Sequence, residues 1–269
     1  MKKVLGLLAS PRKLANGEIL IKEACASIGE EFELELIKMY DLNLQPCKAC
    51  YACLVPDQRC PLNDDLYFLL DRIKEADGII LSSPCYALGP AAMMKLFGDR
   101  IIALAQHIDE IWGKPCIIIG TNGIKGWEGY TLSALIAVAR FIGFYVKDAH
   151  MFVGALPGES LVNVTAMERI HALGASLFSK PRQPEEGQCP TCWSDLWKFP
   201  TPSHAVCPFC GQEATVRSSH DGLQWDFGSP GNRFEKEALK EHFQVWLKDQ
   251  VREFSSRRQE LSEIRSRYS

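Results

Sequence analysis

The sequence has little excess charge of either sign and no long apolar run. Its 269 residues carry 30 lysines and arginines against 33 aspartates and glutamates, so it lacks the electrostatic footprint of a nucleic-acid or anionic-membrane protein. No run approaches the roughly 18 apolar residues of a membrane span. The apolar stretch after Met1 stops at Ser10, which is too early for a secretion signal. We therefore expect a soluble, cytoplasmic protein without nucleic-acid or membrane partners.

Cysteine is abundant and unevenly distributed. Eight of the 11 cysteines fall in two tight clusters, and Cys25, Cys85 and Cys116 stand alone. Disulfides explain such a content in small secreted domains, but here no export signal precedes clusters that have metal-ligand spacing. The pattern therefore predicts two metal sites.

Short apolar runs alternate with helical periodicities up to about residue 180, which is typical of βα units and a parallel sheet. Five strands and five helices are predicted, and they fit an α/β fold with a flavodoxin-like, doubly wound, five-stranded parallel sheet. In such folds a cofactor binds beyond the carboxyl ends of the strands. The predicted strands are Val4 to Ala9, Glu33 to Ile37, Gly78 to Ser82, Cys116 to Gly120 and Tyr145 to Phe152, and the predicted helices are Gly17 to Ile28, Asp64 to Glu75, Pro90 to His107, Tyr130 to Ile142 and Val162 to Ser179.

Polar and proline-bearing stretches divide the chain into three predicted units. Residues 1–182 form the α/β domain, residues 183–230 a small zinc-ribbon-like module, and residues 231–269 a C-terminal amphipathic helix. In that helix an apolar heptad row ends at Tyr268, whereas Gln250 and Arg257 break the complementary row. The pattern favours a helix laid across the body or a neighbouring subunit over a long coiled coil.

The first cysteine cluster has the spacing C-x2-C-x2-C-x6-C and is followed by Pro61. Short spacers let successive thiolates converge on one face of a cubane while the fourth closes it from the other side. Structural zinc more often uses two separated pairs of ligands. We therefore predict a 4Fe-4S cluster, with zinc or thiol chemistry as the alternatives, on Cys47, Cys50, Cys53 and Cys60.

Three loops after strands have the composition of a cofactor site. The first offers a hydroxyl, two cations and an amide before a helix N-terminus, which suits a phosphate monoester, although a solvated basic turn has the same composition. The second can place backbone and an aromatic ring against a flat heterocycle, and the third has glycines at both ends. The candidate residues are Ser10, Arg12, Lys13, Ala15, Asn16 and Gly17; Ser83, Pro84, Cys85, Tyr86, Ala87, Leu88 and Gly89; and Thr121, Asn122 and Gly123.

These residues resemble those of the iron-sulfur flavoproteins within the NADPH-dependent FMN reductase group. The resemblance covers about residues 1–180 and rests on the Ser-Pro-Arg-Lys loop at residue 10, the compact cysteine motif, and Ser83-Pro84-Cys85-Tyr86 followed by Lys95, Phe97, Asp99 and Arg100. It implies that the first loop holds FMN phosphate, that the second contacts the isoalloxazine, and that the cysteines hold a 4Fe-4S cluster. It also implies a homo-oligomer, dimer or tetramer, in which cluster and flavin meet near subunit interfaces.

Two departures from the family pattern concern flavin contacts. Ala15 and Gly17 flank the asparagine where the family usually has a glycine and a hydroxyl residue, so backbone amides must carry more of the phosphate binding. The third loop is also modified, with Trp127 nearby. Cys85 is a candidate reactive thiol, although a cysteine at a strand end is more often a packed apolar residue.

The second cysteine cluster consists of two C-x2-C knuckles separated by 14 residues. This spacing is close to that of a zinc ribbon, whereas rubredoxin-type iron sites usually have a longer separation. We predict structural zinc, with redox iron as the alternative, on Cys189, Cys192, Cys207 and Cys210. His204 between the knuckles is expected to be a loop residue.

The combination predicts an FMN-dependent oxidoreductase. A flavin accepts two electrons and a cubane passes one at a time, which suits transfer between a donor such as ferredoxin and an acceptor. One alternative is an NAD(P)H-dependent FMN or quinone reductase, although no G-x-G-x-x-G follows a predicted strand. Another is a redox-sensing or scaffold protein that binds a partner through its ribbon and tail. No side chain is an obvious catalytic acid, base or nucleophile.

Overall fold

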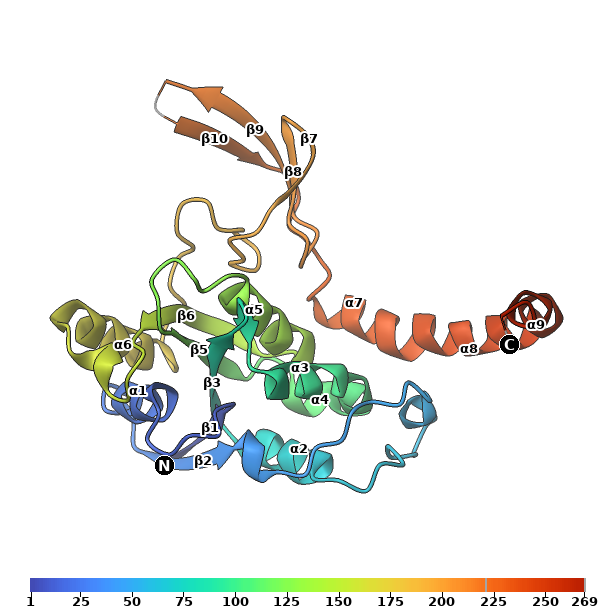
Figure 1. The fold of residues 1–269 in the computed structure, drawn as a ribbon, viewed down its shortest axis with the longest axis horizontal. Coiled ribbons are helices and arrows are strands. Elements are labelled where there is room, and N and C mark those ends of the chain that lie inside the picture. The colour runs from blue at the N-terminus through green and yellow to red at the C-terminus, as the bar shows by residue number, and fades with distance from the viewer. Residues whose placement is uncertain (221, 269) are drawn as a thin grey trace.

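The computed structural model describes residues 1–220 and 222–268 and contains a parallel sheet in the order β2-β1-β3-β5-β6 (Figure 1). This order confirms the predicted doubly wound, flavodoxin-like fold. All neighbouring strands on this path pair in parallel. The strands are β1 (Lys2–Leu8), β2 (Phe32–Lys38), β3 (Gly78–Tyr86), β5 (Pro115–Asn122) and β6 (Tyr145–Val153).

Alternating side chains of the strands are buried on both faces of the sheet. Val4 and Leu8 of β1 contribute to one core cluster, and Leu5 and Leu7 contribute to the other, as the two-residue repeat of a strand requires. Helices α1 (Asn16–Cys25) and α6 (Val164–Ser176) cover the first face. The second face is covered by α2 (Leu66–Glu75), α3 (Ala92–Asp99), α4 (Ile108–Ile111) and α5 (Thr131–Ile142).

The prediction of one helix over Pro90 to His107 is wrong. β3 continues to Tyr86 and turns into a short antiparallel strand, β4 (Gly89–Pro90), which withdraws Pro90 from the helix. Further on, α3 ends at Asp99, and a 3₁₀ segment, η3 (Ile101–His107), follows Arg100. The Arg100 side chain is fully buried, and the break in the helix lies at this residue.

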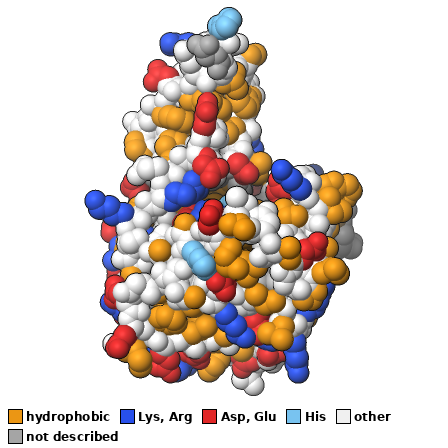
Figure 2. Space-filling view, turned by 90° about the vertical axis from the view of Figure 1, so that its left-hand side faces the viewer, with side chains coloured by type: hydrophobic (Ala, Val, Ile, Leu, Met, Phe, Trp, Pro, Cys, Tyr) orange, Lys and Arg blue, Asp and Glu red, His pale blue; other side chains and the backbone are white. Residues whose placement is uncertain are grey.

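After α6 the chain builds a separate antiparallel sheet in the order β10-β9-β8-β7. Small side chains at Ala205 and Ala214 form its interior, and the rings of Trp197 and Trp225 pack against them with their centroids 4.9 Å apart. Figure 2 shows this ribbon as a narrow protrusion above the body. Its strands are β7 (Lys198–Thr201), β8 (His204–Val206), β9 (Glu213–Ser219) and β10 (Gly222–Phe227).

The C-terminal region is helical but interrupted. Its first part buries Phe243 and Leu247 against the α/β body, and the Gln244 side-chain amide donates to the Ala105 carbonyl at 3.2 Å. Beyond Leu247 the helix runs away from the body (Figure 1). Its segments are α7 (Lys236–Lys240), the π-helical η5 (Glu241–Trp246), α8 (Leu247–Ser256) and α9 (Arg258–Arg265). Within the described residues, no helix is long and apolar enough to span a membrane.

Candidate flavin and metal sites

A pocket of about 240 Å³ lies where four parallel strands end. β1, β3, β5 and β6 all contribute residues at their carboxyl ends, which is where this fold class binds cofactors. The lining residues are Ser10, Arg12, Ala15, Asn16, Gly17, Pro84, Cys85, Tyr86, Thr121, Asn122, Gly123, Gly154 and Ala155.

The first turn of α1 opens directly onto this pocket. Ala15 occupies the N-cap position and supplies no side-chain cap, and the first backbone N–H groups of any α-helix have no intrahelical acceptor. A Cβ atom on Gly17 would lie 2.6 Å from the Ser82 hydroxyl and 2.9 Å from a Leu8 methyl. Glycine therefore lets α1 approach the sheet closely and places the start of the helix at the pocket, and a helix N-terminus favours an anion.

The Asn16 side chain bonds to protein backbone, whereas the pattern of the loop predicted a contact with the cofactor. Its side-chain amide donates to the Gly154 carbonyl at 2.8 Å and accepts from the Gly158 N–H at 2.7 Å. Both acceptor and donor capacity are thus directed at the loop after β6, and this residue fastens that loop to the start of α1. Asn16 lines the pocket as a brace between two of its walls.

Glu18 stabilises the backbone turn that precedes α1. One carboxylate oxygen accepts from the Leu14 N–H at 3.0 Å, where Leu14 has a left-handed backbone with φ 49°. A hydrogen bond from Lys22 is the largest cause that lowers the pKa of Glu18 to about 2, with Lys38 adding to it against the opposing effect of burial. The charged carboxylate holds a backbone conformation that a leucine rarely adopts.

The loop after β5 is clamped onto the turn after β3. Ala87 and Leu88 both have positive φ, at 50° and 65°, and the Tyr130 N–H donates to the Leu88 carbonyl at 2.9 Å. A Cβ on Gly129 would lie 2.1 Å from that same carbonyl oxygen, so glycine is required for the contact. Tyr86, which lines the pocket, is exposed, as are the side chains of Trp127 and Tyr130 in the loop after β5.

Two polar atoms in this region bear on what the pocket can hold. Asn122 donates to the Ile124 carbonyl at 2.6 Å, while its buried Oδ1 has no hydrogen-bond partner among the described residues. A buried acceptor of this kind needs a donor, and an N–H of a bound heterocycle would supply it. The Cys85 thiol lies 3.5 Å from the carbonyls of Trp127 and Glu128.

The structure does not bring every predicted flavin residue into the pocket. Ser83 lies buried beneath it, where its hydroxyl accepts from the Ala91 N–H at 3.0 Å, and Gly89 pairs with Tyr86 in the β3–β4 hairpin. Lys13, Ala87 and Leu88 are exposed outside the lining. The sequence prediction missed Gly154 and Ala155, although their position after the fifth strand was an available signal.

The first four cysteines lie on an exposed loop after β2 that contains a short 3₁₀ turn, η2 (Ala52–Leu54). Cys47 and Cys50 are exposed, Cys60 is half-buried and Cys53 is buried. Burial raises the pKa of the Cys53 thiol to about 11, and the neighbouring charges of Cys60, Cys47 and Cys50 add to the rise. The other three thiols therefore lie within electrostatic reach of Cys53, yet the four do not form a compact group around one ion.

Three residues of this loop have left-handed backbone. Ala49, Tyr51 and Asp57 have φ values of 49°, 57° and 63°, and such conformations persist only where surrounding structure or a ligand over-determines them. The Ala49 N–H points at the Cys47 sulfur at 3.4 Å. A cubane distributes its four thiolates over separate irons, so ligands spread more widely than around one ion fit it.

The loop is anchored to the body through η3. The Gln106 side-chain amide donates to the carbonyls of Cys53 at 2.6 Å, Val55 at 2.9 Å and Gln58 at 3.2 Å. The C-terminal helix packs on the other side of η3 through Gln244. The C-terminal region therefore buttresses the segment that holds the cysteine loop.

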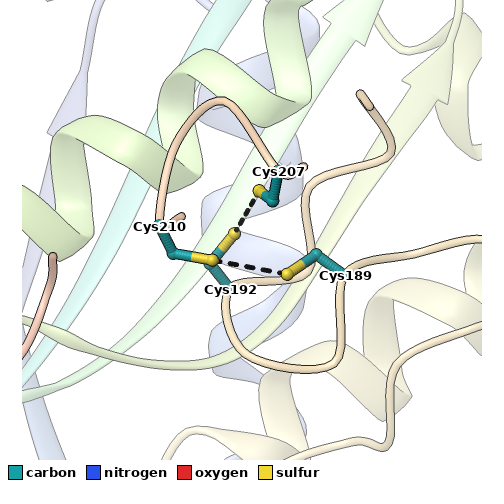
Figure 3. Close-up of side chains that lie close together, drawn as sticks. All are labelled: Cys189, Cys192, Cys207 and Cys210. Carbon is teal, nitrogen blue, oxygen red and sulfur yellow. Dashed lines mark hydrogen bonds between the residues drawn. The ribbon is translucent and has the colours of Figure 1, made fainter. Parts of the chain in front are cut away.

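The second four cysteines do form a compact group, drawn in Figure 3. All four are buried, and their sulfur atoms lie within 4.8 Å of one another. The Cys189–Cys210 and Cys192–Cys207 sulfur pairs are separated by 3.4 and 3.5 Å. Zinc–sulfur bonds of about 2.3 Å in a tetrahedron place sulfurs about 3.8 Å apart. The four thiols fit one tetrahedral ion, and His204 stays outside their group.

The metal knuckles are docked on α5. Arg140 donates to the Thr191 carbonyl, and the Ser133 hydroxyl lies 3.0 Å from that of Ser194. On the far side, Arg233 donates to the carbonyls of Pro208 and Phe209 at 2.8 and 3.1 Å. A metal here would fix the ribbon to the helix that follows the β5 loop of the pocket.

Comparison with known proteins places the α/β body in a family. Residues 2–155 match the NADPH-dependent FMN reductase family. An iron-sulfur flavoprotein of Methanocaldococcus jannaschii is 43% identical over 125 residues, which are 45% of this chain and 64% of that protein. A flavone synthase of Aspergillus candidus is 27% identical over 217 residues, covering 68% and 67% of the two chains.

One solved structure extends the likeness to the whole chain. A flavone reductase is 19% identical, with a TM-score of 0.74, and the match covers 99% of this chain and 96% of that one. At this identity the likeness shows the fold alone, and it includes the ribbon and the tail. The chain spans less than two thirds of the Methanocaldococcus relative. Since the family match covers more than half of the chain and encloses the pocket, the chain belongs to the NADPH-dependent FMN reductase family of FMN-dependent oxidoreductases.

Proposed function

We propose that this chain is an iron-sulfur flavoprotein, in which FMN in the β1–β3–β5–β6 pocket exchanges electrons with a 4Fe-4S cluster held by Cys47, Cys50, Cys53 and Cys60. The observation that carries the proposal is the presence of both sites on one α/β body: the pocket at the strand ends and the four-cysteine loop anchored through η3. The likeness to an iron-sulfur flavoprotein over 125 residues supports it.

The pocket residues suit the parts of FMN. The N–H groups at the start of α1 and the Arg12 guanidinium would hold the phosphate, because a helix N-terminus and a cation are complementary to an anion. The unpartnered Asn122 Oδ1 would accept from an N–H of the ring system. The loops after β3 and β5 would cover its faces, with Pro84, Cys85 and Tyr86 on one side.

The cluster would supply one-electron chemistry beside a cofactor that takes two electrons. Gln106 binds three backbone carbonyls of the cysteine loop. The Ala49 N–H faces the Cys47 sulfur, and an Arg100 side-chain N–H faces the Cys60 sulfur. Such donors stabilise thiolates that carry cluster charge. Exposure of Cys47 and Cys50 leaves one side of the loop open to a redox partner such as ferredoxin.

We also propose a homo-oligomer, a dimer or tetramer. The exposed side chains of Tyr86 at the pocket and of Trp127 and Tyr130 in the loop after β5 offer apolar surface that a second copy would cover. The four-cysteine group of the ribbon would hold zinc, which has no redox change of its own. Zinc there would hold the ribbon against α5 and leave electron flow to the other two centres.

The proposal is tested by replacing one cluster ligand. Cys50→Ala, purified and analysed without oxygen, should lose cluster iron and keep FMN, because the pocket is built by other loops. Cys25→Ala removes a buried cysteine outside all three sites and should keep both cofactors. Full iron in Cys50→Ala, or wild-type protein without iron, would contradict the cluster assignment.

A second candidate is an NAD(P)H-dependent reductase of a flat organic acceptor such as a flavone or quinone. Two observations favour it: the whole-chain likeness to a flavone reductase and the exposed Tyr86 ring in the pocket lining. Steady-state NADPH and NADH oxidation with a flavone or a quinone distinguishes the candidates. A Cys50→Ala protein that keeps the wild-type rate would favour the reductase, whereas loss of ferredoxin-linked turnover alone would favour the relay.

A further inference from the structure

Arg100 lies buried beside the cysteine loop at the break between α3 and η3. Its side chain is 1% exposed. One guanidinium nitrogen donates to the Gln45 carbonyl at 2.6 Å and to the Asp64 carboxylate. The other faces the second carboxylate oxygen at 3.3 Å and the Cys60 sulfur at 3.4 Å.

Asp64 fixes the direction of this guanidinium. Its buried carboxylate also accepts from the backbone N–H groups of Gln45 at 2.9 Å and Leu66 at 3.3 Å. These bonds hold the Asp64 carboxylate in place. Its bidentate contact with Arg100 therefore leaves the guanidinium little freedom to rotate. The Cys60 N–H in turn donates to the Tyr67 hydroxyl at 2.7 Å, so both members of the Arg100–Cys60 contact are held in place.

We propose that Arg100 raises the reduction potential of the cluster by directing its guanidinium at the Cys60 sulfur. The inference rests on the proposed 4Fe-4S site and deepens it. Reduction of the cluster adds one electron from an external donor and moves no proton at Arg100. The added negative charge is stabilised by a positively charged N–H donor that is held 3.4 Å from the Cys60 sulfur.

Gln106 provides the matched control. It also anchors the cysteine loop from a neighbouring position, but its three contacts are to carbonyls of Cys53, Val55 and Gln58. Gln106→Ala therefore loosens the loop without removing a charge or a donor from a sulfur. A purely structural role of Arg100 predicts that the two positions behave alike.

The experiment is an anaerobic reductive titration of the full chain, with the cluster followed by electron paramagnetic resonance and the flavin by absorbance. Arg100→Gln should make the cluster at least tenfold harder to reduce, which corresponds to a fall of about 59 mV for one electron. Gln106→Ala should leave the potential unchanged. Arg100→Lys keeps a positive charge but loses the bidentate geometry that aims a donor at the Cys60 sulfur, so it should also lower the potential, by less than Arg100→Gln does, and it provides the test if Arg100→Gln does not fold.

Each outcome separates the inference from the proposed function. A full complement of iron with an unchanged potential in Arg100→Gln, or in Arg100→Lys, overturns the role of Arg100 and leaves the iron-sulfur proposal standing. A wild-type protein without iron overturns both. A shift of equal size in Gln106→Ala reduces Arg100 to a structural anchor.

Discussion

Asn16 joins two walls of the proposed flavin pocket. Asn16→Ala leaves the Gly154 carbonyl and the Gly158 N–H without the partners they have at 2.8 and 2.7 Å. A buried polar group that loses its partner costs about 1–3 kcal/mol. The free energy of unfolding should therefore fall by about 2–4 kcal/mol, measured by urea denaturation of the FMN-free protein.

The same change should weaken FMN binding. Without Asn16 the loop after β6 is no longer tied to the start of α1, so the N–H groups that would hold the phosphate lose their support. We expect at least about a tenfold rise in Kd, equivalent to about 1.4 kcal/mol, followed by flavin fluorescence.

Asn163→Ala is the matched control for Asn16→Ala. Asn163 caps α6: its exposed Oδ1 accepts from the Ala166 N–H at 2.9 Å and from the Thr165 hydroxyl, and the residue does not line the pocket. Its loss should cost about 1 kcal/mol and leave FMN affinity unchanged. Equal effects of the two variants on stability and affinity would refute the bracing role.

The remaining predictions concern the phosphate loop, the first turn of α1 and the ribbon. Arg12→Ala should weaken FMN roughly tenfold or more while riboflavin binding stays the same, whereas Lys13→Ala, outside the pocket lining, should change FMN affinity less than about threefold. The pKa of Glu18 in the folded protein is lowered from 4.5 to about 2, so its stabilising effect is complete above pH 4.5 and is lost as the pH falls toward 2. The difference in unfolding free energy between wild type and Glu18→Gln should therefore shrink as the pH falls from 4.5 toward 2. A difference that stays constant over this range would contradict the prediction. Cys207→Ser should release the metal of the ribbon and lower the unfolding free energy by at least about 3 kcal/mol, or roughly 6–12 °C in melting temperature, while any folded protein keeps its flavin spectrum; zinc analysis and calorimetry check it.

The centre of the sheet could be predicted because β1, β3 and β5 are largely buried on both faces and contain nearly continuous apolar runs. The compact metal group could also be predicted, since two knuckles with ribbon spacing leave few other arrangements. Local patterns did not predict the break in the helix at Arg100. Its cause is tertiary: Arg100 turns inward to Asp64, which is 36 residues away in the sequence.

The roles within the flavin loops were the part that sequence could not resolve. Lys13 and Asn16 have the composition of phosphate ligands, yet the structure places Lys13 outside the pocket and directs the Asn16 amide to backbone groups more than 130 residues away. Gly154 and Ala155 carry no side-chain chemistry to mark them. The residues that line a pocket depend on where loops distant in the sequence meet, and the hydrophobic periodicity of the sequence does not contain that information.

The central claim is that one chain carries a flavin, a cubane and a structural metal. It is tested most directly by iron, zinc and flavin analysis of protein purified without oxygen. We expect about four irons and one zinc per chain together with one FMN. Protein with flavin but with zinc in place of iron at Cys47 to Cys60, or without metal there, would contradict it.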